Sequence, residues 1–116
     1  MAESIVAGKS ELFAIRIINL YKYLFDKKKE FILSKQILRS GTSIGANLVE
    51  AKFAISKKDF ICKFHISIKE CSETLYWLRL LKETGYLSQN EFDSIYSECE
   101  EILKILVTSI KTAKKK

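Results

Sequence analysis

The 116-residue chain contains no proline, and no other feature restricts its possible folds as strongly. Proline interrupts an α-helix more effectively than any other residue, so its absence leaves long helices free to form. Only four glycines are present. No stretch alternates apolar and polar residues over the length of a β-strand, and no internal repeat is evident. The sequence therefore predicts a single all-α domain over residues 1–116.

Apolar residues recur at helical spacing in four segments, which predict helices over residues 10–28, 32–54, 57–84 and 89–113. The sequences Ser56–Asp59 and Ser88–Glu91 resemble capping boxes at two of the helix starts, and Gly85 follows the third helix as a stop signal. The expected core face of the first helix carries Phe13, Ile17, Leu20 and Leu24, and that of the second carries Ile37, Ile44, Leu48 and Ile55. The core face of the third carries Phe60, Phe64, Cys71, Leu75, Leu78 and Leu81. The core face of the fourth carries Phe92, Ile95, Cys99, Leu103, Leu106 and Ile110. Short connections make consecutive helices antiparallel neighbours, which predicts an up-down four-helix bundle.

Residues 12–25 and 74–81 are apolar on more than one helical face. A second apolar face must also be buried, and in so small a domain we expect it to meet another subunit. A wide core covered by loops is the alternative. Because residues 12–25 also carry Arg16, Asn19 and Lys22, they are too charged to span a bilayer, and we expect no membrane association.

The three cysteines, Cys62, Cys71 and Cys99, show no C-x-x-C spacing and lie in apolar helical patterns. A thiol in such a position behaves as a small hydrophobic group. Their odd number and the lack of a signal peptide predict a reducing, cytoplasmic location.

Residues 41–45, Gly-Thr-Ser-Ile-Gly, match the G-x-S-x-G pattern of hydrolases. That nucleophile elbow requires a strand before the serine, whereas residues 34–39 already have a helical pattern. The single histidine, His65, has no spacing that places it beside Ser43. Because residues 40–46 are nearly all small, we interpret the segment as a place of close helix contact or bending.

The sequence Ala7–Ser10 resembles the end of a phosphate-binding loop, but the glycine required five positions before Gly8 is Glu3. No other catalytic pattern is present. We therefore expect no enzyme, no cofactor and no small-molecule substrate.

Polar residues at i, i+3 spacing recur as Asn47 and Glu50, and as Glu70 and Glu73. Di-metal helical bundles use Glu-x-x-His twice, and neither pair here has the histidine. We therefore expect a half-buried polar network with Arg39 as counterion, and no metal.

Two segments resemble the four-helix bundle protein family, also called the 23S rRNA intervening sequence proteins. "LRSGTSIGANLVEAKFA" carries its first motif at Arg39, Ser43, Ile44, Asn47 and Glu50. "FICKFHISIKECSETLYWLRLLKETGYL" carries its second at Glu70, Glu73, Thr74, Trp77 and Leu78. The family-motif polar network thus comprises Arg39, Ser43, Asn47, Glu50, Glu70 and Glu73. Gly41 departs from the pattern, since relatives often have alanine there.

The resemblance implies a barrel-like ring of bundles, with a homopentamer favoured, in a family whose biochemical role is undefined. The chain is also distantly similar to the accessory variability proteins of diversity-generating retroelements. Those are basic pentamers that work with a reverse transcriptase and nucleic acid. Some relatives are encoded inside insertions in rRNA genes, which favours RNA as a partner.

A formal net charge of +6 suggests an anionic partner. In the predicted topology a group of lysines gathers where the first and third helices start and the second and fourth end. This basic end comprises Lys9, Lys52, Lys57, Lys58, Lys111, Lys114, Lys115 and Lys116. The opposite end mixes lysines with acids, namely Asp26, Glu30, Glu83, Glu91 and Asp93.

Lysines without interleaved aromatic residues favour contact with phosphates over reading of bases. We therefore predict salt-sensitive, sequence-independent binding of nucleic acid at the basic end. Two alternatives are a merely solvated charged rim and a protein–protein adaptor that docks on a larger enzyme such as a reverse transcriptase.

Overall fold

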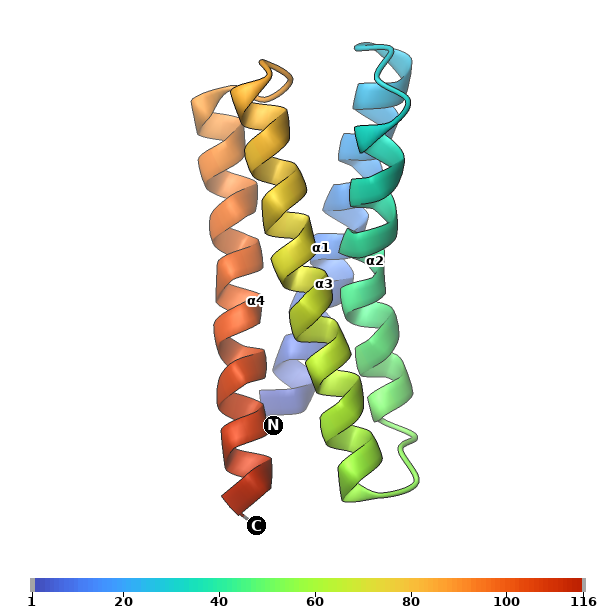
Figure 1. Ribbon diagram of the computed structural model, residues 1–116, viewed down its shortest axis with the longest axis vertical. Coiled ribbons are helices and arrows are strands. Elements are labelled where there is room, and N and C mark those ends of the chain that lie inside the picture. The colour runs from blue at the N-terminus through green and yellow to red at the C-terminus, as the bar shows by residue number, and fades with distance from the viewer. Residues whose placement is uncertain (1, 116) are drawn as a thin grey trace.

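The computed structural model describes residues 2–115, which form four α-helices and no strand. The helices are α1 (Ala2–Asp26), α2 (Leu33–Ala51), α3 (Lys57–Glu83) and α4 (Gln89–Lys115). They run alternately up and down, so both termini lie at the lower end in Figure 1. Each helix packs against its neighbour in the chain, and α4 closes the bundle against α1. The prediction of an all-α bundle of four helices is confirmed.

Three helix boundaries are set by the capping residues that the sequence indicates. The Ser56 hydroxyl accepts a hydrogen bond from the backbone N–H of Asp59 at 3.0 Å and so caps α3. At the start of α4, the Glu91 N–H donates to the Ser88 hydroxyl at 3.2 Å, and the Ser88 N–H donates to the Glu91 carboxylate at 2.8 Å. Gly85 has φ of +85° just after α3, a conformation that glycine adopts without strain.

The start of α2 uses a cap that the charge pattern does not reveal. Glu30, expected among the surface acids of the upper end, is buried. Its carboxylate accepts hydrogen bonds from the backbone N–H groups of Leu33 at 3.1 Å and Ser34 at 2.7 Å. The Ser34 hydroxyl donates to the Glu30 carbonyl at 2.7 Å. The carboxylate thus pairs N–H groups that have no partner inside the helix.

Two helix ends differ from the sequence pattern. α1 begins at Ala2 instead of residue 10, and Val6 and Ser10 continue its buried stripe. α2 ends at Ala51 instead of residue 54, and the chain leaves the helix there. Ile55, predicted for the core, is consequently 94% exposed in the α2–α3 connection, because helical periodicity no longer governs its direction.

Close contact between α1 and α2 depends on a glycine. A Cβ atom added at Gly41 would lie 2.8 Å from Cγ1 of Ile17, closer than side chains pack. At Gly45 the same atom would make an ordinary contact at 3.5 Å with Cβ of Ser10. The small-residue segment is therefore a site of close helix contact, as predicted. No helix within residues 2–115 is long and apolar enough to cross a membrane.

Candidate nucleic-acid interface

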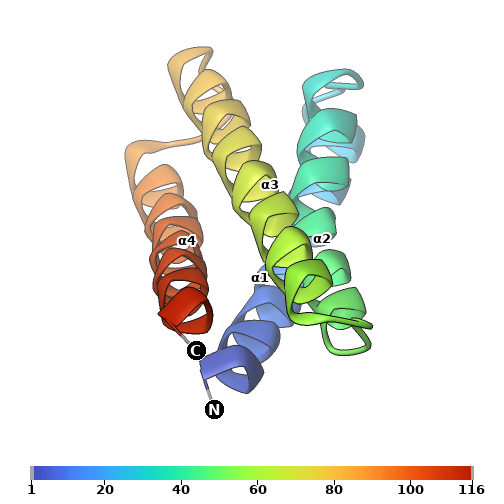
Figure 2. The same ribbon diagram turned by 60° about the horizontal axis from the view of Figure 1, so that its bottom comes forward.

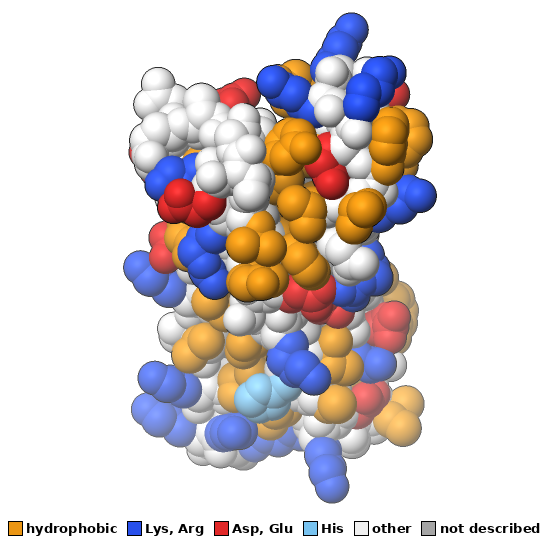
Figure 3. Space-filling view, turned by 45° about the horizontal axis from the view of Figure 1, so that its top comes forward, with side chains coloured by type: hydrophobic (Ala, Val, Ile, Leu, Met, Phe, Trp, Pro, Cys, Tyr) orange, Lys and Arg blue, Asp and Glu red, His pale blue; other side chains and the backbone are white. Residues whose placement is uncertain are grey.

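Lysines from α3, α4 and the connection after α2 surround the lower end of the bundle, which Figure 2 turns toward the viewer. Lys52 directly follows α2, Lys57 and Lys58 open α3, and the last turns of α4 carry three more. All of these side chains are exposed: Lys52, Lys57, Lys58, Lys111, Lys114 and Lys115. Lys116 lies outside the described residues. In Figure 3 several Lys and Arg side chains gather at the lower left of the visible face, without acidic side chains among them.

These six lysines form no ion pair with an acid in the described part of the chain; the lysines that do are Lys9, Lys63 and Lys82. Asp59, an acid adjacent to Lys58 in the sequence, is engaged at the start of α3, where its carboxylate accepts a hydrogen bond from the Ile55 N–H at 3.2 Å. An unpaired surface cation can approach a phosphate without first breaking an internal contact. Attraction of this kind supplies most nonspecific affinity for nucleic acid.

Lys9 is separated from this group. Because α1 begins earlier than predicted, Lys9 lies about two turns inside the helix and not at its start. Its Nζ is 2.5 Å from Oε1 of Glu101 on α4. Lys9 therefore links α1 to α4 and does not belong with the other lysines of the basic end.

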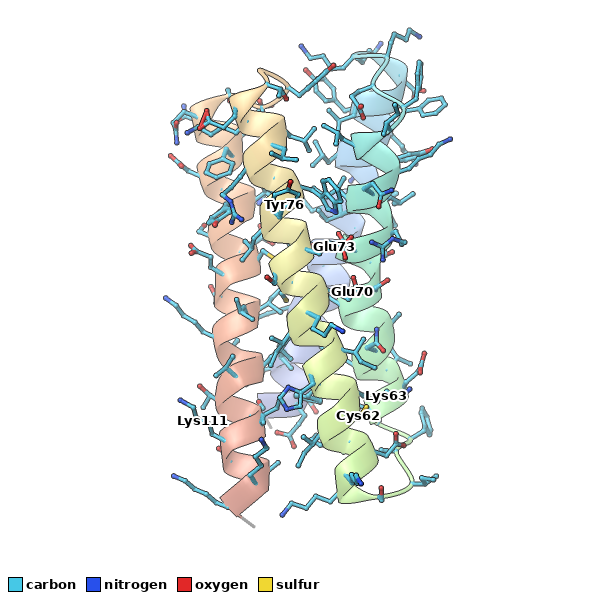
Figure 4. The ribbon with its side chains drawn as sticks, viewed as in Figure 1. Cys62, Lys63, Glu70, Glu73, Tyr76 and Lys111 are labelled. Carbon is cyan, nitrogen blue, oxygen red and sulfur yellow. The ribbon has the colours of Figure 1, made fainter. Side chains whose placement is uncertain are left out.

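Lys104 was missed by the sequence reasoning. It is exposed on α4 and shares one helical face with Lys111 and Lys115, at i, i+7 and i+11. The spacing is readable in the sequence, but Lys104 lies well before the end of α4. Figure 4 shows Lys111 on the lower part of the same helix. The lysine stripe extends the basic end along the side of α4.

The family-motif residues lie along the α2–α3 seam, the line of contact between these helices. Arg39 of α2 pairs with Glu73 of α3, and its Nη1 lies 3.7 Å from Oε1 of Glu70. The indole N–H of Trp77 donates to the Glu73 carboxylate at 3.1 Å. Figure 4 shows Glu70 and Glu73 on the side of α3 that faces α2. Arg39 thus holds the two helices together near the middle of the bundle.

Glu70 is the more deeply placed of the two carboxylates. Only 18% of its side chain is exposed, and its Oε1 has no hydrogen-bond partner among residues 2–115. Burial raises the pKa of Glu70 above its ordinary value, an effect that the Arg39 charge partly offsets. This carboxyl group therefore keeps its proton more readily than a surface glutamate does.

The remaining motif residues make separate contacts. Glu50 accepts a hydrogen bond from Lys63 at 2.9 Å, and this bond raises the pKa of Lys63. The Asn47 side chain donates to the Ser43 carbonyl at 2.9 Å, within α2. The predicted set is therefore three local arrangements and not one continuous network. Within residues 2–115 no group of His, Cys, Asp and Glu side chains is placed to hold a metal ion.

Ser43 lies in the middle of α2, with helix on both sides. Its hydroxyl donates to the Arg39 carbonyl at 2.6 Å, the usual bond of a serine inside a helix. The G-x-S-x-G residues therefore do not form the strand–turn–helix elbow of a hydrolase.

Comparisons with known proteins agree with this architecture. The family model for the 23S rRNA-intervening sequence protein matches residues 2–108. A crystal structure from Bacteroides thetaiotaomicron, described as a protein with unknown function from the S23 ribosomal protein family, is 52% identical, with a TM-score of 0.95. That match covers 96% of this chain and 99% of the other. Among curated proteins no match was found. The chain belongs to the 23S rRNA-intervening sequence protein family.

Proposed function

We propose that the protein is a non-enzymatic, cytoplasmic homo-oligomer that binds nucleic acid, preferably RNA, through its basic end. The observation that carries the proposal is the group of six exposed lysines without described ionic partners. They come from α3, α4 and the residue after α2, and the fold places them together at one end of the bundle. Phosphates are common to all nucleotides, so binding through these lysines does not depend on nucleotide sequence. Lysine is a point charge that suits phosphate better than base edges.

Exposed apolar residues on α1 support the oligomer. The exposed fractions are 68% for Leu12, 58% for Ile5 and 50% for Ile15. Residues 74–81 behave differently, because Leu75, Leu78 and Leu81 are buried and only Tyr76 is an exposed large hydrophobic residue there. The spare apolar face therefore belongs to α1. A pentamer, favoured by the resemblance, would repeat the basic end around a ring and strengthen weak phosphate contacts.

Light scattering tests the oligomer. We expect five times the chain mass of 13.4 kDa for the wild type. A variant with Leu12→Asp and Ile15→Asp should dissociate, because both substitutions place charge in the proposed contact. A monomeric wild type would contradict the oligomer. The proposal that the lysines bind nucleic acid would then be tested only by the binding measurements below.

Nucleic-acid binding is tested by fluorescence anisotropy with structured RNA and duplex DNA across a salt series. The affinity should fall with salt, with a log–log slope of about 0.9 per neutralised phosphate on duplex DNA. The test variant carries Lys58→Glu, Lys111→Glu, Lys114→Glu and Lys115→Glu. The matched control carries Lys22→Glu, Lys27→Glu, Lys28→Glu and Lys35→Glu at the other end and lowers the net charge equally.

We expect the test variant to lose binding and the control to retain most of it. Equal losses in the two variants would point to net charge alone and would remove the case for a localised surface. An intact oligomer that binds neither RNA nor DNA at low salt would contradict the proposal.

The second candidate function is a protein–protein adaptor. It is favoured by Phe53 and Ile55, which are 77% and 94% exposed beside the lysines of the basic end. Large apolar side chains are unusual partners for phosphate and common anchors at protein interfaces. If Phe53→Ser and Ile55→Ser abolish capture of a purified reverse transcriptase while RNA affinity is unchanged, the adaptor role is supported.

A further inference from the structure

A cavity of about 450 Å³ opens at the lower end of the bundle, between α4, the start of α3 and the start of α1. Its apolar wall includes Phe60 of α3 and Ile105 and Ala113 of α4. A second cavity of about 470 Å³ also contacts Phe60 and extends to Phe64 and the end of α2. Cavities of this size match those that hold small organic ligands.

The space exists because no large apolar residue occupies the last inward position of α4 or the first of α1. The buried stripe of α4 ends with Ile110, and the next inward position is Ala113. On α1 the stripe begins at Val6, and the position one turn earlier is Glu3. The large apolar residues Phe53 and Ile55 of the same end point into solvent. Large apolar side chains are therefore present at this end of the bundle, but they do not fill the cavity.

A buried hydroxyl group adds a polar feature to the cavity. Ser109 lines it and is only 8% exposed, and its Oγ has no hydrogen-bond partner among the described residues. A buried hydroxyl without a partner is unfavourable, so most such groups in proteins are paired. Thr108 and Thr112 also line the cavity from α4. This cavity thus offers hydrogen bonding beside an apolar wall.

The charges at the cavity favour an anion. Lys57 and Lys104 line it, against one acid, Glu3. Both lysines are exposed, and neither is in an ion pair with an acid in residues 2–115. The lysines chosen above for the nucleic-acid test, Lys58, Lys111, Lys114 and Lys115, do not line the cavity.

We propose that this cavity binds an amphipathic organic anion, with its apolar body against Phe60 and Ile105 and its carboxylate or sulfonate facing Lys57 and Lys104. Thr108 and Thr112, which line the cavity and are exposed, supply hydrogen bonds to polar atoms of the ligand, and the small Ser109 side chain leaves room for its body. The site shares Lys57 and Lys104 with the basic end, but the lysines substituted in the nucleic-acid test lie outside the cavity, so the two proposals can fail separately.

The test uses fluorescence titration of the full-length protein with anilinonaphthalene sulfonate, an aromatic sulfonate whose emission rises in apolar surroundings. We expect saturable binding of one probe per chain and displacement by sodium decanoate. Ser109→Leu should weaken binding by about tenfold or more, since the larger side chain fills the cavity. Lys104→Glu should also weaken it, whereas Lys22→Glu, on the distant part of α1, should not.

Circular dichroism of each variant establishes that it is folded. If Ser109→Leu fails to fold, Thr112→Phe blocks the cavity from an exposed position and takes its place. Absence of saturable binding to the wild type, or full binding by a folded cavity-filling variant, would overturn the proposal. Unchanged affinity in Lys104→Glu would overturn the choice of an anion.

Discussion

The α2–α3 seam and the α1–α4 seam both carry ion pairs between partly exposed side chains, but among the described residues only the α2–α3 seam of these two also carries buried side-chain hydrogen bonds. In the α2–α3 seam, the Ser67 hydroxyl donates to the Ile44 carbonyl at 2.9 Å, and Oγ1 of Thr74 lies 2.8 Å from Oγ of Ser40. All of these groups are buried. The α1–α4 seam is joined by Lys9 with Glu101 and by Arg16 with Glu98, whose side chains are 38–56% exposed.

The difference has a physical consequence. Buried hydrogen bonds are costly to break because a group left unpaired has no water to replace its partner, whereas exposed ion pairs exchange with water and salt. Cavities of 450 and 250 Å³ both lie between α1 and α4, and the cavity of 470 Å³ lies at the lower end, against the end of α2. The middle of α2 is therefore closely packed against α1 and α3, whereas the open space lies along the α1–α4 seam and at the lower end of the bundle.

The tight side is tested most severely at Gly41. Gly41→Leu should destabilise the fold by about 3 kcal/mol, because even the first added carbon would collide with Ile17. Chemical denaturation at fixed protein concentration measures the effect. Gly8→Ala on α1 is the control, since an added Cβ there meets nothing within 4 Å. It should stabilise the helix by up to about 1 kcal/mol. Similar effects for both substitutions would contradict the close contact.

Thr74→Val probes the buried hydroxyl pair. The substitution keeps the shape of the side chain but removes the partner of Ser40, so we expect a loss of about 1–2 kcal/mol. Thr84→Val is the matched control, because the Thr84 hydroxyl is exposed and bonds only within its own helix turn. If Thr84→Val is as destabilising as Thr74→Val, the buried pair adds no particular strength to the α2–α3 seam.

The looser side is tested by a double-mutant cycle on Arg16→Ala and Glu98→Ala. We expect a coupling free energy below about 1 kcal/mol in low salt, declining as salt is added, because both side chains are partly exposed. Thermal or urea unfolding of the four proteins supplies the values. A coupling that exceeds the cost of Thr74→Val would reverse the comparison between the two seams.

The smallest effect is expected in the pH dependence of stability. Because the pKa of Glu70 is raised in the folded protein, the fold binds more protons than the unfolded chain just above pH 4.5, the ordinary pKa. This group therefore makes stability fall as the pH rises from there through the raised value. Glu70→Gln should remove that decline, while Arg39 keeps its contact with Glu73.

Glu91 provides a control of opposite sign. Its hydrogen bond with the Ser88 backbone lowers the pKa of Glu91, so its contribution is present above the ordinary pKa and is lost as the pH falls through the lowered value. Glu91→Gln should remove this acid-side loss. Urea unfolding at a series of pH values distinguishes the two, and identical profiles for both variants would contradict the assignment.

Much of the fold was readable in the sequence because its signals are local. The Ser88–Glu91 box and Gly85 act within one helical turn, and the periodic stripes require only the 3.6-residue repeat. The burial of Phe13, Ile17 and Leu78 follows from that repeat alone. The six unpaired lysines could be grouped because an antiparallel order places alternate helix ends together.

Other features could not be read in this way because they depend on distant partners. Glu30 is buried and caps the start of α2, and Lys9 pairs with Glu101 of α4. The burial of Glu30 and the pairing of Lys9 both depend on how the helices pack, which the local sequence does not specify. Ile55 was misplaced by assuming that α2 continued past Ala51. The cavity beside Ser109 is the space that residues of α1, α3 and α4 leave unfilled, and the sequence of one helix alone does not predict it.

The sequence by itself thus determined four helices, their order and most of their caps, because the absence of proline and the helical period act through short-range geometry. Only the tertiary structure decided which charges are paired, which apolar residues remain exposed and where space is left at the lower end. Those outcomes depend on contacts between residues far apart in the chain. The distances between such residues are fixed only when the helices pack together.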